Sequence, residues 1–387
     1  MPELAVDYTD ILAAAERVRP YIHRTPILTS RRIDEIAGAS LFFKAEPLQK
    51  TGSFKARGAT NGVFSLSGED AAKGVATHSS GNFAAALAQA AAWRGIPAHV
   101  VMPTSAPEAK RLATEGYGAT IVQCEPTLEA RETTLADVVA DTGATFLHPY
   151  NDARVIAGQG TAGLELMDVV PDLDTVLVPV GGGGLCSGVA IAVHRGHDAS
   201  AKPESSHAHD IHVVDDSSQD AHDIHVVDES SQDARASTAG AAGEQVMNPG
   251  YLPRLQVSDT STSRGGNFPI PVYGVEPEIA DDAKLSLDTG TLQPSKNALT
   301  IADGLRTALG TLTFPILHHH LEDILLVSED EIRDAMLLIW TRLKLVVEPS
   351  GATVLAALLK HRELFAGKRV GLVLSGGNVD LSSIRIV

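Results

Sequence analysis

Short apolar runs alternate with alanine- and leucine-rich stretches along most of this chain, and this alternation constrains its fold more than any other feature. Residues 41–43, 98–101 and 175–178 are typical of buried strands, whereas residues 81–94 and 187–194 favour helices. Strands and helices that alternate at this rhythm predict a parallel sheet covered by helices on both faces. We therefore predict an α/β fold. The 387 residues suffice for two packed domains.

Charge and hydropathy exclude two classes of function. Asp and Glu number 48 against 31 Lys and Arg, a formal net charge of −17, so the chain would repel a nucleic-acid backbone. No stretch approaches the roughly eighteen apolar residues that cross a bilayer, so we expect no membrane segment. Only Cys124 and Cys186 are present, and the first residues lack the basic segment of a signal peptide. We therefore expect a cytoplasmic protein without a disulfide framework.

Residues 196–267 do not follow the alternation. They contain a tandem repeat, HDIHVVDDSSQDA at 209–221 and HDIHVVDESSQDA at 222–234. Ser, Asp, His and Gly dominate the segment, so it cannot bury enough apolar surface to offset the entropy of ordering. We predict a mostly disordered, acidic, low-complexity insertion. Its histidines would bind divalent metals only weakly, and a solvated loop grown by duplication is the simpler interpretation.

The strongest local signal for chemistry is QKTGSFKARG at residues 49–58. A turn at Gly52 delivers Lys55 to the predicted start of a helix. Burial among small residues and the positive helix-end amides can lower the pKa of such a lysine until it acts as a nucleophile or base. Taken alone, it is more simply a surface lysine that begins an ordinary helix.

A second signal is a run of four glycines, residues 181–184, between a predicted strand and a predicted helix. In this arrangement, backbone N–H groups converge on a phosphate with help from the helix dipole. The run has neither the GxxxxGK[ST] pattern of a P-loop nor a strict GxGxxG. We therefore predict a site for a single phosphate rather than for ATP or a dinucleotide.

Two further loops, HSSGN at 78–82 and SGGN at 375–378, follow predicted strands. Each alone suits a capped turn, which is the more frequent role of Ser, Asn and Gly. Together with Lys55 and the glycine run, they would all serve a lysine Schiff base to an aldehyde cofactor that carries a phosphate and a ring nitrogen.

These motifs make the chain resemble the fold-type II pyridoxal-phosphate enzymes, specifically the serine racemases and serine/threonine dehydratases, with a likeness to plant members. The resemblance spans about residues 22–381 and is carried by KTGSFKARGA, THSSGN, VPVGGGG, GVEPEIADDA, TIADGL, VEPSGA and LSGGNVDL. It implies a two-domain fold like that of the tryptophan synthase β chain. A large cofactor-binding domain would comprise residues 1–70 and 153–387, including the insertion, and a small domain of residues 73–150 would close over the substrate.

The resemblance also implies roles for individual residues. Lys55 matches the lysine that binds pyridoxal 5'-phosphate and acts as a base on one face of the substrate Cα, and Ser80 matches the acid/base on the other face. Cofactor contacts are implied for Phe54, Lys55, Asn82, Gly181, Gly182, Gly183, Gly184, Leu185 and Ser375, and substrate contacts for Ser79, Ser80, Asn82 and Arg131. Glu276, Ala280 and Asp282 match the family's site for Mg²⁺, Ca²⁺ or Mn²⁺, although the residues alone suggest an acidic turn.

The implied activity is racemisation of L-serine to D-serine, with dehydration of serine and threonine, by a homodimer. A neutral Ser375 opposite the ring nitrogen would weaken the ring as an electron sink and favour dehydration. Phe83 stands where the family usually has His, which leaves substrate choice open. Two alternatives remain: a dehydratase acting on threonine, serine or 3-hydroxyaspartate, and a cofactor-binding protein without turnover.

Overall fold

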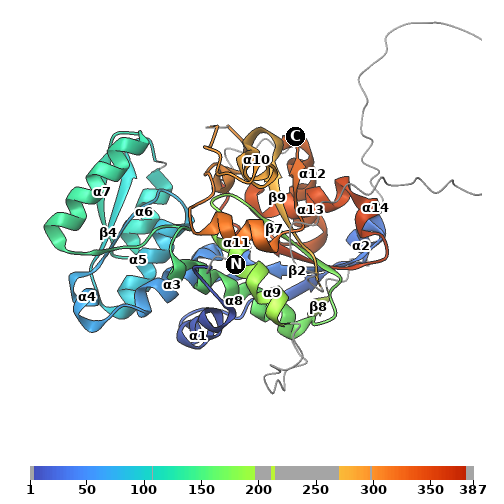
Figure 1. Cartoon of the computed structure of the whole chain (residues 1–387), viewed down its shortest axis with the longest axis horizontal. Helices are drawn as coiled ribbons and strands as arrows, with labels where there is room; N and C mark the ends of the chain where they lie inside the picture. The colour runs from blue at the N-terminus through green and yellow to red at the C-terminus, as the bar shows by residue number, and fades with distance from the viewer. Residues whose placement is uncertain (1–3, 107, 197–210, 214–269, 297–298, 381–387) are drawn as a thin grey trace, which may run out of the picture. The chain divides into compact units, whose positions relative to one another are not determined.

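The structure is a computed structural model, and it describes residues 4–106, 108–196, 211–213, 270–296 and 299–380. These residues belong to one compact unit that contains two sheets (Figure 1). Strands and helices alternate along the chain, and nearly all strand pairs are parallel, so the predicted α/β class is confirmed. No helix in this described part combines the length and the apolar character needed to cross a membrane.

The larger sheet has seven strands in the order β10-β9-β7-β11-β2-β1-β8, and only the β1–β2 pair is antiparallel. The strands are β1 (Ile27–Thr29), β2 (Ser40–Ala45), β7 (Thr175–Pro179), β8 (Ile211–Val213), β9 (Val272–Pro277), β10 (Asp323–Val327) and β11 (Arg369–Leu374). Within β2, Leu41 and Phe43 belong to one hydrophobic core and Phe42 to another. Both faces of the sheet are therefore buried, which explains why its strands read as continuous apolar runs.

Helices cover the two faces of this sheet. On one face, Ile33, Ile332 and Leu355 contribute to the core, and on the other, Leu166 and Val189 do so. The helices of this part are α1 (Tyr8–Val18), α2 (Arg31–Ala37), α3 (Lys55–Phe64), α8 (Ala153–Val169), α9 (Gly184–Gly196), α10 (Asp282–Thr289), α11 (Thr313–His320), α12 (Glu329–Leu338), α13 (Pro349–Lys360) and α14 (Arg362–Phe365). The predicted helix at 187–194 is confirmed, with α9 beginning directly at the glycine run.

The smaller sheet has four parallel strands in the order β5-β4-β3-β6. They are β3 (Val75–His78), β4 (Ala98–Pro103), β5 (Thr120–Cys124) and β6 (Thr145–Phe146), accompanied by α4 (Gly68–Lys73), α5 (Asn82–Arg94), α6 (Glu108–Gly116) and α7 (Leu128–Thr142). The predicted helix at 81–94 is confirmed as α5. The boundaries predicted for a small domain at residues 73 and 150 stay a prediction.

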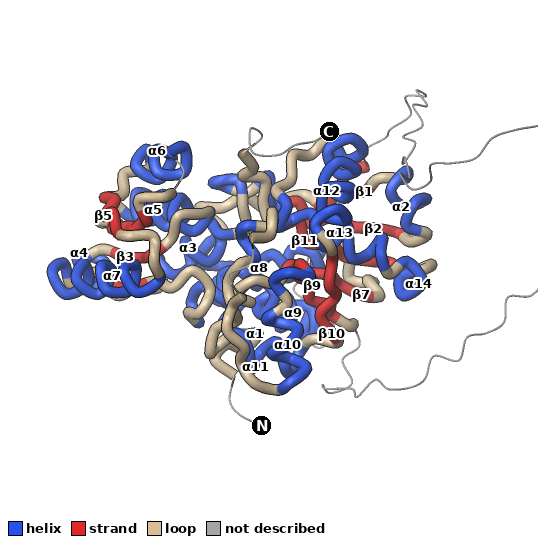
Figure 2. The backbone as a smooth tube through the Cα atoms, turned by 90° about the horizontal axis from the view of Figure 1, so that it is seen from above, coloured by secondary structure: helices blue, strands red, loops and turns tan. Residues whose placement is uncertain are grey.

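Close packing of α3, α8 and α9 sets the distance between the two motif-bearing helices. A Cβ built on Gly158 of α8 would lie 2.7 Å from the Cα of Gly58 in α3, and one on Gly188 of α9 would lie 2.5 Å from the backbone nitrogen of Gly160. Only glycine permits such an approach of helix backbones. Figure 2 shows α3 and α8 between the strands of the two sheets.

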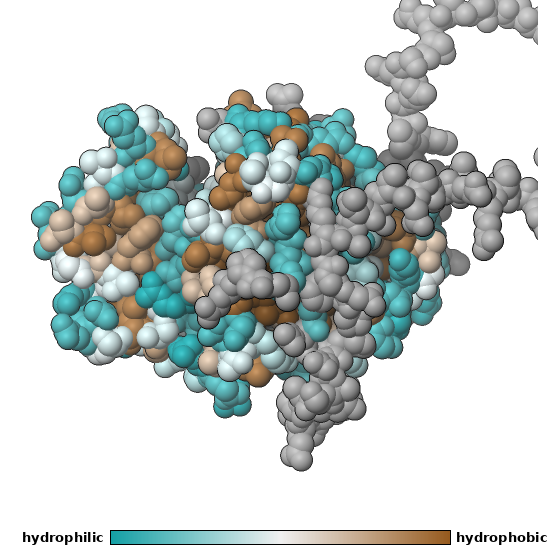
Figure 3. Space-filling model, viewed as in Figure 1, coloured by the Kyte–Doolittle hydropathy of each residue, from teal (hydrophilic) through white to brown (hydrophobic). Residues whose placement is uncertain are grey.

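Most of the predicted insertion, including the second copy of its repeat, lies outside the described residues. Three residues of the first copy form β8, which pairs in parallel with β1 at the edge of the larger sheet. The pattern of residues alone does not predict this strand. Over the described residues, Figure 3 shows hydrophilic and hydrophobic side chains interspersed on the visible face.

Candidate active site

Lys55 is the first residue of α3, directly after the sharp turn that the sequence predicted. Gly52 has a φ of +74°, and a Cβ there would lie 2.4 Å from Oδ1 of Asn378, so this turn requires glycine. The Lys55 Nζ donates to the carbonyl oxygen of Pro149 at 2.9 Å and lies 4.9 Å from the centroid of the Phe54 ring. Burial lowers the pKa of Lys55 to about 8, so a useful fraction of the amine is uncharged near neutral pH.

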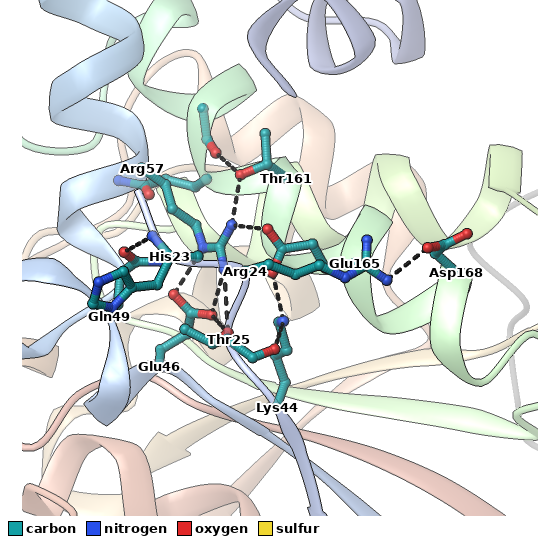
Figure 4. Close-up of polar contacts among 12 residues, drawn as sticks. His23, Arg24, Thr25, Lys44, Glu46, Gln49, Arg57, Thr161, Glu165 and Asp168 are labelled. Atoms are coloured by element: carbon teal, nitrogen blue, oxygen red, sulfur yellow. Dashed lines mark hydrogen bonds and ion pairs between the residues drawn. The ribbon is translucent and has the colours of Figure 1, made fainter. Parts of the chain in front are cut away.

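A buried network of charges fixes this end of α3 (Figure 4). Arg57 donates through Nε and Nη2 to both oxygens of Glu46, each at 2.8 Å. It also donates to both oxygens of Glu165 at 2.8 Å, and Lys44 donates to Glu165 at 2.6 Å. Arg57 and Glu46 are fully buried. Sequence reasoning missed the network because its members come from β2, α3, α8 and the segment after β2.

The loop after β11 is joined to the lysine turn through the backbone. Phe54 N–H donates to the carbonyl oxygen of Ser375 at 3.0 Å, and Ser53 forms an isolated antiparallel bridge with Gly376. The hydroxyls of Ser53 and Ser375 are buried, and neither makes a hydrogen bond within the described residues. Two unsatisfied hydroxyls beside Lys55 indicate a place for a polar ligand, because buried polar groups normally have partners.

The glycine loop is held between Tyr150 and the segment around Thr313. A Cβ on Gly182 would lie 2.3 Å from the Tyr150 ring, and one on Gly181 would lie 2.8 Å from the carbonyl oxygen of Gly304. The Thr313 hydroxyl donates to the carbonyl oxygen of Gly182 at 2.8 Å. The loop is therefore packed rather than flexible, and Gly183, Gly184 and Leu185 lead into α9 with the buried N-terminus that suits a phosphate.

The SSGN loop between β3 and α5 contacts the segments before α13 and after β11 through Asn82. The Asn82 Nδ2 donates to both carboxylate oxygens of Glu348, at 3.2 and 3.0 Å, and its Oδ1 accepts from Asn378 at 2.9 Å. Within the loop, Gly81 N–H donates to the Ser79 hydroxyl at 3.3 Å. The loop that carries Ser80 is thereby joined to the loop that carries Ser375.

Glu348 is a site residue that sequence reasoning missed. It precedes α13 in the motif VEPSGA. An acidic residue before Pro is typical of an ordinary helix start, so the sequence alone does not indicate a role in the site. Burial raises its pKa to about 7, although the hydrogen bond from Asn82 lowers it. The one feature of the sequence that could have identified Glu348 as a site residue is its place in VEPSGA, one of the motifs that carry the resemblance to pyridoxal-phosphate enzymes.

Two other predicted residues lie on helices that accompany the smaller sheet. Phe83 is buried in the core of that sheet, with its ring centroid 5.7 Å from the Lys55 Nζ. Arg131, on α7, lies near His78, since its charge lowers the pKa of that histidine beside the larger effect of burial. His78 ends β3 and directly precedes Ser79, so Arg131 lies near the start of the SSGN loop. Its buried Nε has no hydrogen bond within the described residues.

Glu276 and Asp282 form a second group of buried carboxyls. Glu276 is the next-to-last residue of β9 and accepts from the backbone N–H groups of Ala283 at 3.1 Å and Lys284 at 3.0 Å. Burial first, and also the charge of Asp282, raise its pKa to about 9. Both oxygens of Asp282 are buried without a hydrogen bond in the described part of the chain. Ala280 is buried in the turn between them. No described cluster of three or more His, Cys, Asp or Glu side chains could hold a metal ion.

The site combines a lysine with a lowered pKa, a packed glycine loop at a helix N-terminus and two unsatisfied hydroxyls near the lysine. Together these features define a cofactor-dependent α/β enzyme. Residues 18–252 and 257–376 match the family model described as pyridoxal-phosphate dependent enzyme, and the chain belongs to that family.

Similar proteins cover this chain almost end to end. It is 42% identical to the beta-hydroxyaspartate dehydratase of Paracoccus denitrificans (strain Pd 1222), over 97% of this chain and 98% of that protein. It is 41% identical to the serine racemase of Dictyostelium discoideum, over 99% and 98% of the two chains. The crystal structure of serine racemase from that organism has a TM-score of 0.77 and 40% identity, over 97% of this chain and 100% of that one.

Proposed function

We propose that this chain is a pyridoxal-phosphate-dependent serine racemase that also dehydrates serine and threonine. The observation that carries the proposal is the joining of two loops from different sheets beside Lys55. Asn82 of the SSGN loop is bound by Glu348 and Asn378 from the side of the larger sheet. The relationship to a serine racemase over nearly the whole chain supports the choice of substrate.

The residues present fit the cofactor. The N–H groups of the glycine loop and the N-terminus of α9 would bind its phosphate, and the unsatisfied hydroxyl of Ser375 would face its ring nitrogen. Asn82 would bind its ring hydroxyl, and Phe54 would flank the ring. When bound, pyridoxal phosphate supplies an aldehyde that condenses with amines and a ring that withdraws electrons from the substrate Cα.

Proton transfer at Cα falls to this chain's own side chains. Lys55, with a pKa of about 8, would remove the proton from one face. Ser80 would return a proton from the opposite face, and Arg131 would bind the substrate carboxylate. Inversion at Cα requires both groups, whereas dehydration requires only one of them. A neutral hydroxyl at Ser375 would leave the ring nitrogen unprotonated, which favours loss of the β-hydroxyl.

A dehydratase acting on 3-hydroxyaspartate is the second candidate function. It is favoured by the 42% identity to a beta-hydroxyaspartate dehydratase over nearly the full length of both chains. The substrate preference also depends on Phe83. Its ring centroid lies 5.7 Å from the Lys55 Nζ, and it places an apolar ring where the family usually has a polar His.

A divalent cation, Mg²⁺, Ca²⁺ or Mn²⁺, is proposed at Glu276, the carbonyl oxygen of Ala280 and Asp282. The unsatisfied oxygens of Asp282 and the mutual repulsion of two buried carboxyls support a positive charge there. A homodimer and a cytoplasmic location are further proposals, and the two buried free cysteines accord with a reducing compartment.

The test is incubation of the purified chain with pyridoxal phosphate, Mg²⁺ and either L-serine or 3-hydroxyaspartate. D-serine formed together with pyruvate and ammonia is expected from L-serine. Ser80→Ala should abolish D-serine but retain pyruvate, and Ser105→Ala, at an exposed position, is the control. An oxo acid from 3-hydroxyaspartate with neither product from L-serine would establish the second candidate. No product from either substrate, despite cofactor binding, would refute both.

A further inference from the structure

Glu348 is fixed more firmly than an ordinary helix cap. Its backbone N–H donates to the carbonyl oxygen of Gly376 at 2.9 Å, and its own carbonyl oxygen accepts from Gly351 at 2.9 Å and Ala352 at 3.2 Å. Its side chain does not cap α13, and only 5% of the residue is exposed. The backbone therefore holds the carboxyl in one place, aimed away from its own helix.

The carboxyl points into the junction of the two motif loops. Asn82 donates to both of its oxygens, and a Cβ on Gly376 would lie 2.8 Å from Oε1, so that glycine leaves the space that the carboxyl occupies. Asn378 donates to Oδ1 of Asn82 at 2.9 Å and to the carbonyl oxygen of Thr51 at 2.7 Å. One carboxyl thus connects the SSGN loop, the loop after β11 and, through Asn378, the turn before Lys55.

We propose that Glu348 is a positioning residue of this site, which holds the SSGN loop through Asn82 and lies across Gly376 from Ser53 of the lysine turn. The inference concerns the same site as the proposed function and rests on it for the roles of Lys55 and Asn82. It adds a residue that acts through both of them.

Electrostatics agrees with the geometry. Burial raises the pKa of Glu348 to about 7; the Asn82 hydrogen bond, Lys110 and the backbone N–H of Asn378 lower it, and Asp303 raises it. Burial lowers the pKa of Lys55 to about 8, and the Glu348 carboxylate opposes this effect. Lys110 and Asp303 pair with each other at 2.8 Å. The Glu348 carboxyl and the Lys55 amine therefore change charge in neighbouring ranges of pH, and each affects the other.

The charge of Glu348 raises the pKa of Lys55. Above about pH 7 Glu348 carries its negative charge, which stabilises the charged form of Lys55. Replacing Glu348 by Gln keeps the shape and one acceptor oxygen for Asn82 but removes the charge. The pKa of Lys55 should then fall, and each unit of fall gives roughly tenfold more free amine at a fixed pH below it.

The test measures the free amine of Lys55 directly. The full-length chain, freed of cofactor, is pulsed with acetic anhydride between pH 6 and 10, and modification of Lys55 is quantified by peptide mass spectrometry. In Glu348→Gln the midpoint of labelling should move to lower pH by up to about one unit. Glu348→Asp, which keeps the charge, should restore the wild-type midpoint. Glu363→Gln, at an exposed position on α14, is the control.

An unmoved midpoint in Glu348→Gln, with thermal unfolding like that of the wild type, would overturn the proposal. So would an equal shift in Glu348→Asp. The pH dependence of cofactor rebinding, followed by absorbance, should move in parallel with the labelling. A shifted labelling midpoint in a chain that binds no cofactor would uphold the role of Glu348 and refute the proposed function instead.

Discussion

The buried network around Arg57 predicts a large loss of stability when its guanidinium is removed. Arg57→Met retains apolar volume but leaves Glu46 and Glu165 with Lys44 as the one other cation in the network. Removing one partner of a buried ion pair costs about 3 to 5 kcal/mol, because an uncompensated charge stays buried. We expect a decrease of that size in the free energy of unfolding at pH 7.

The pKa of Glu165 gives a second estimate of how much the network contributes to the free energy of unfolding. Burial opposes ionisation of this carboxyl, yet the charges of Arg57 and Lys44 hold its pKa at about 2, against an ordinary value of 4.5. At about 1.4 kcal/mol per unit, this difference contributes roughly 3 to 4 kcal/mol to stability at neutral pH. Because the folded pKa is the lower one, the contribution is complete above about pH 5 and is lost as the pH falls toward 2. The destabilisation of Arg57→Met should therefore shrink as the solution is acidified.

The assay is urea unfolding of the wild type and of Arg57→Met at pH 7, 5 and 3.5, monitored by far-UV circular dichroism. Arg333→Met is the matched control, because Arg333 pairs with Asp330 at 2.6 Å on the surface and such pairs contribute less than about 1 kcal/mol. A loss below about 1 kcal/mol for Arg57→Met at pH 7 would refute the reasoning. A loss that stays constant down to pH 3.5 would show that Glu165 is not the group responsible.

Two further predictions concern ligands. Gly182→Ala would place a Cβ 2.3 Å from the Tyr150 ring, so the loop must shift; we expect affinity for pyridoxal phosphate, titrated by absorbance, to fall at least about tenfold. Gly68→Ala, where nothing lies near the Cβ, is the control, and equal affinities in both variants would contradict the packing argument. Mg²⁺ or Ca²⁺ should raise the melting temperature at pH 7 and release protons, since burial raises the pKa of Glu276 to about 9. Asp282→Asn should remove this response; a wild-type melting temperature that no divalent cation moves would contradict the cation site.

The sequence predicted those parts of the molecule that depend on local pattern. The α/β class follows from apolar runs such as 175–178, and the glycine run and Lys55 stand out because a loop must carry unusual residues to bind a phosphate or present an amine. The partners of Arg57 could not be predicted, because Glu165 lies 108 residues away and only the fold brings the two together. Glu348 was missed for a similar reason, since its contact with Asn82, 266 residues away, forms only in the folded chain.

The strand β8 moves the open edge of the larger sheet from β1 to three residues of the repeat segment. Without it, β1 would present a row of unpaired backbone N–H and C=O groups, which invites edge-to-edge pairing and aggregation. Residues 211–213 occupy that edge in parallel register, from Ile27 opposite Ile211 to Thr29 opposite Val213. The chain segment in which a 13-residue unit was duplicated thus supplies the edge strand of the larger sheet, and a strand this short offers few backbone groups to another chain. A shortened version of the protein should therefore keep residues 211–213.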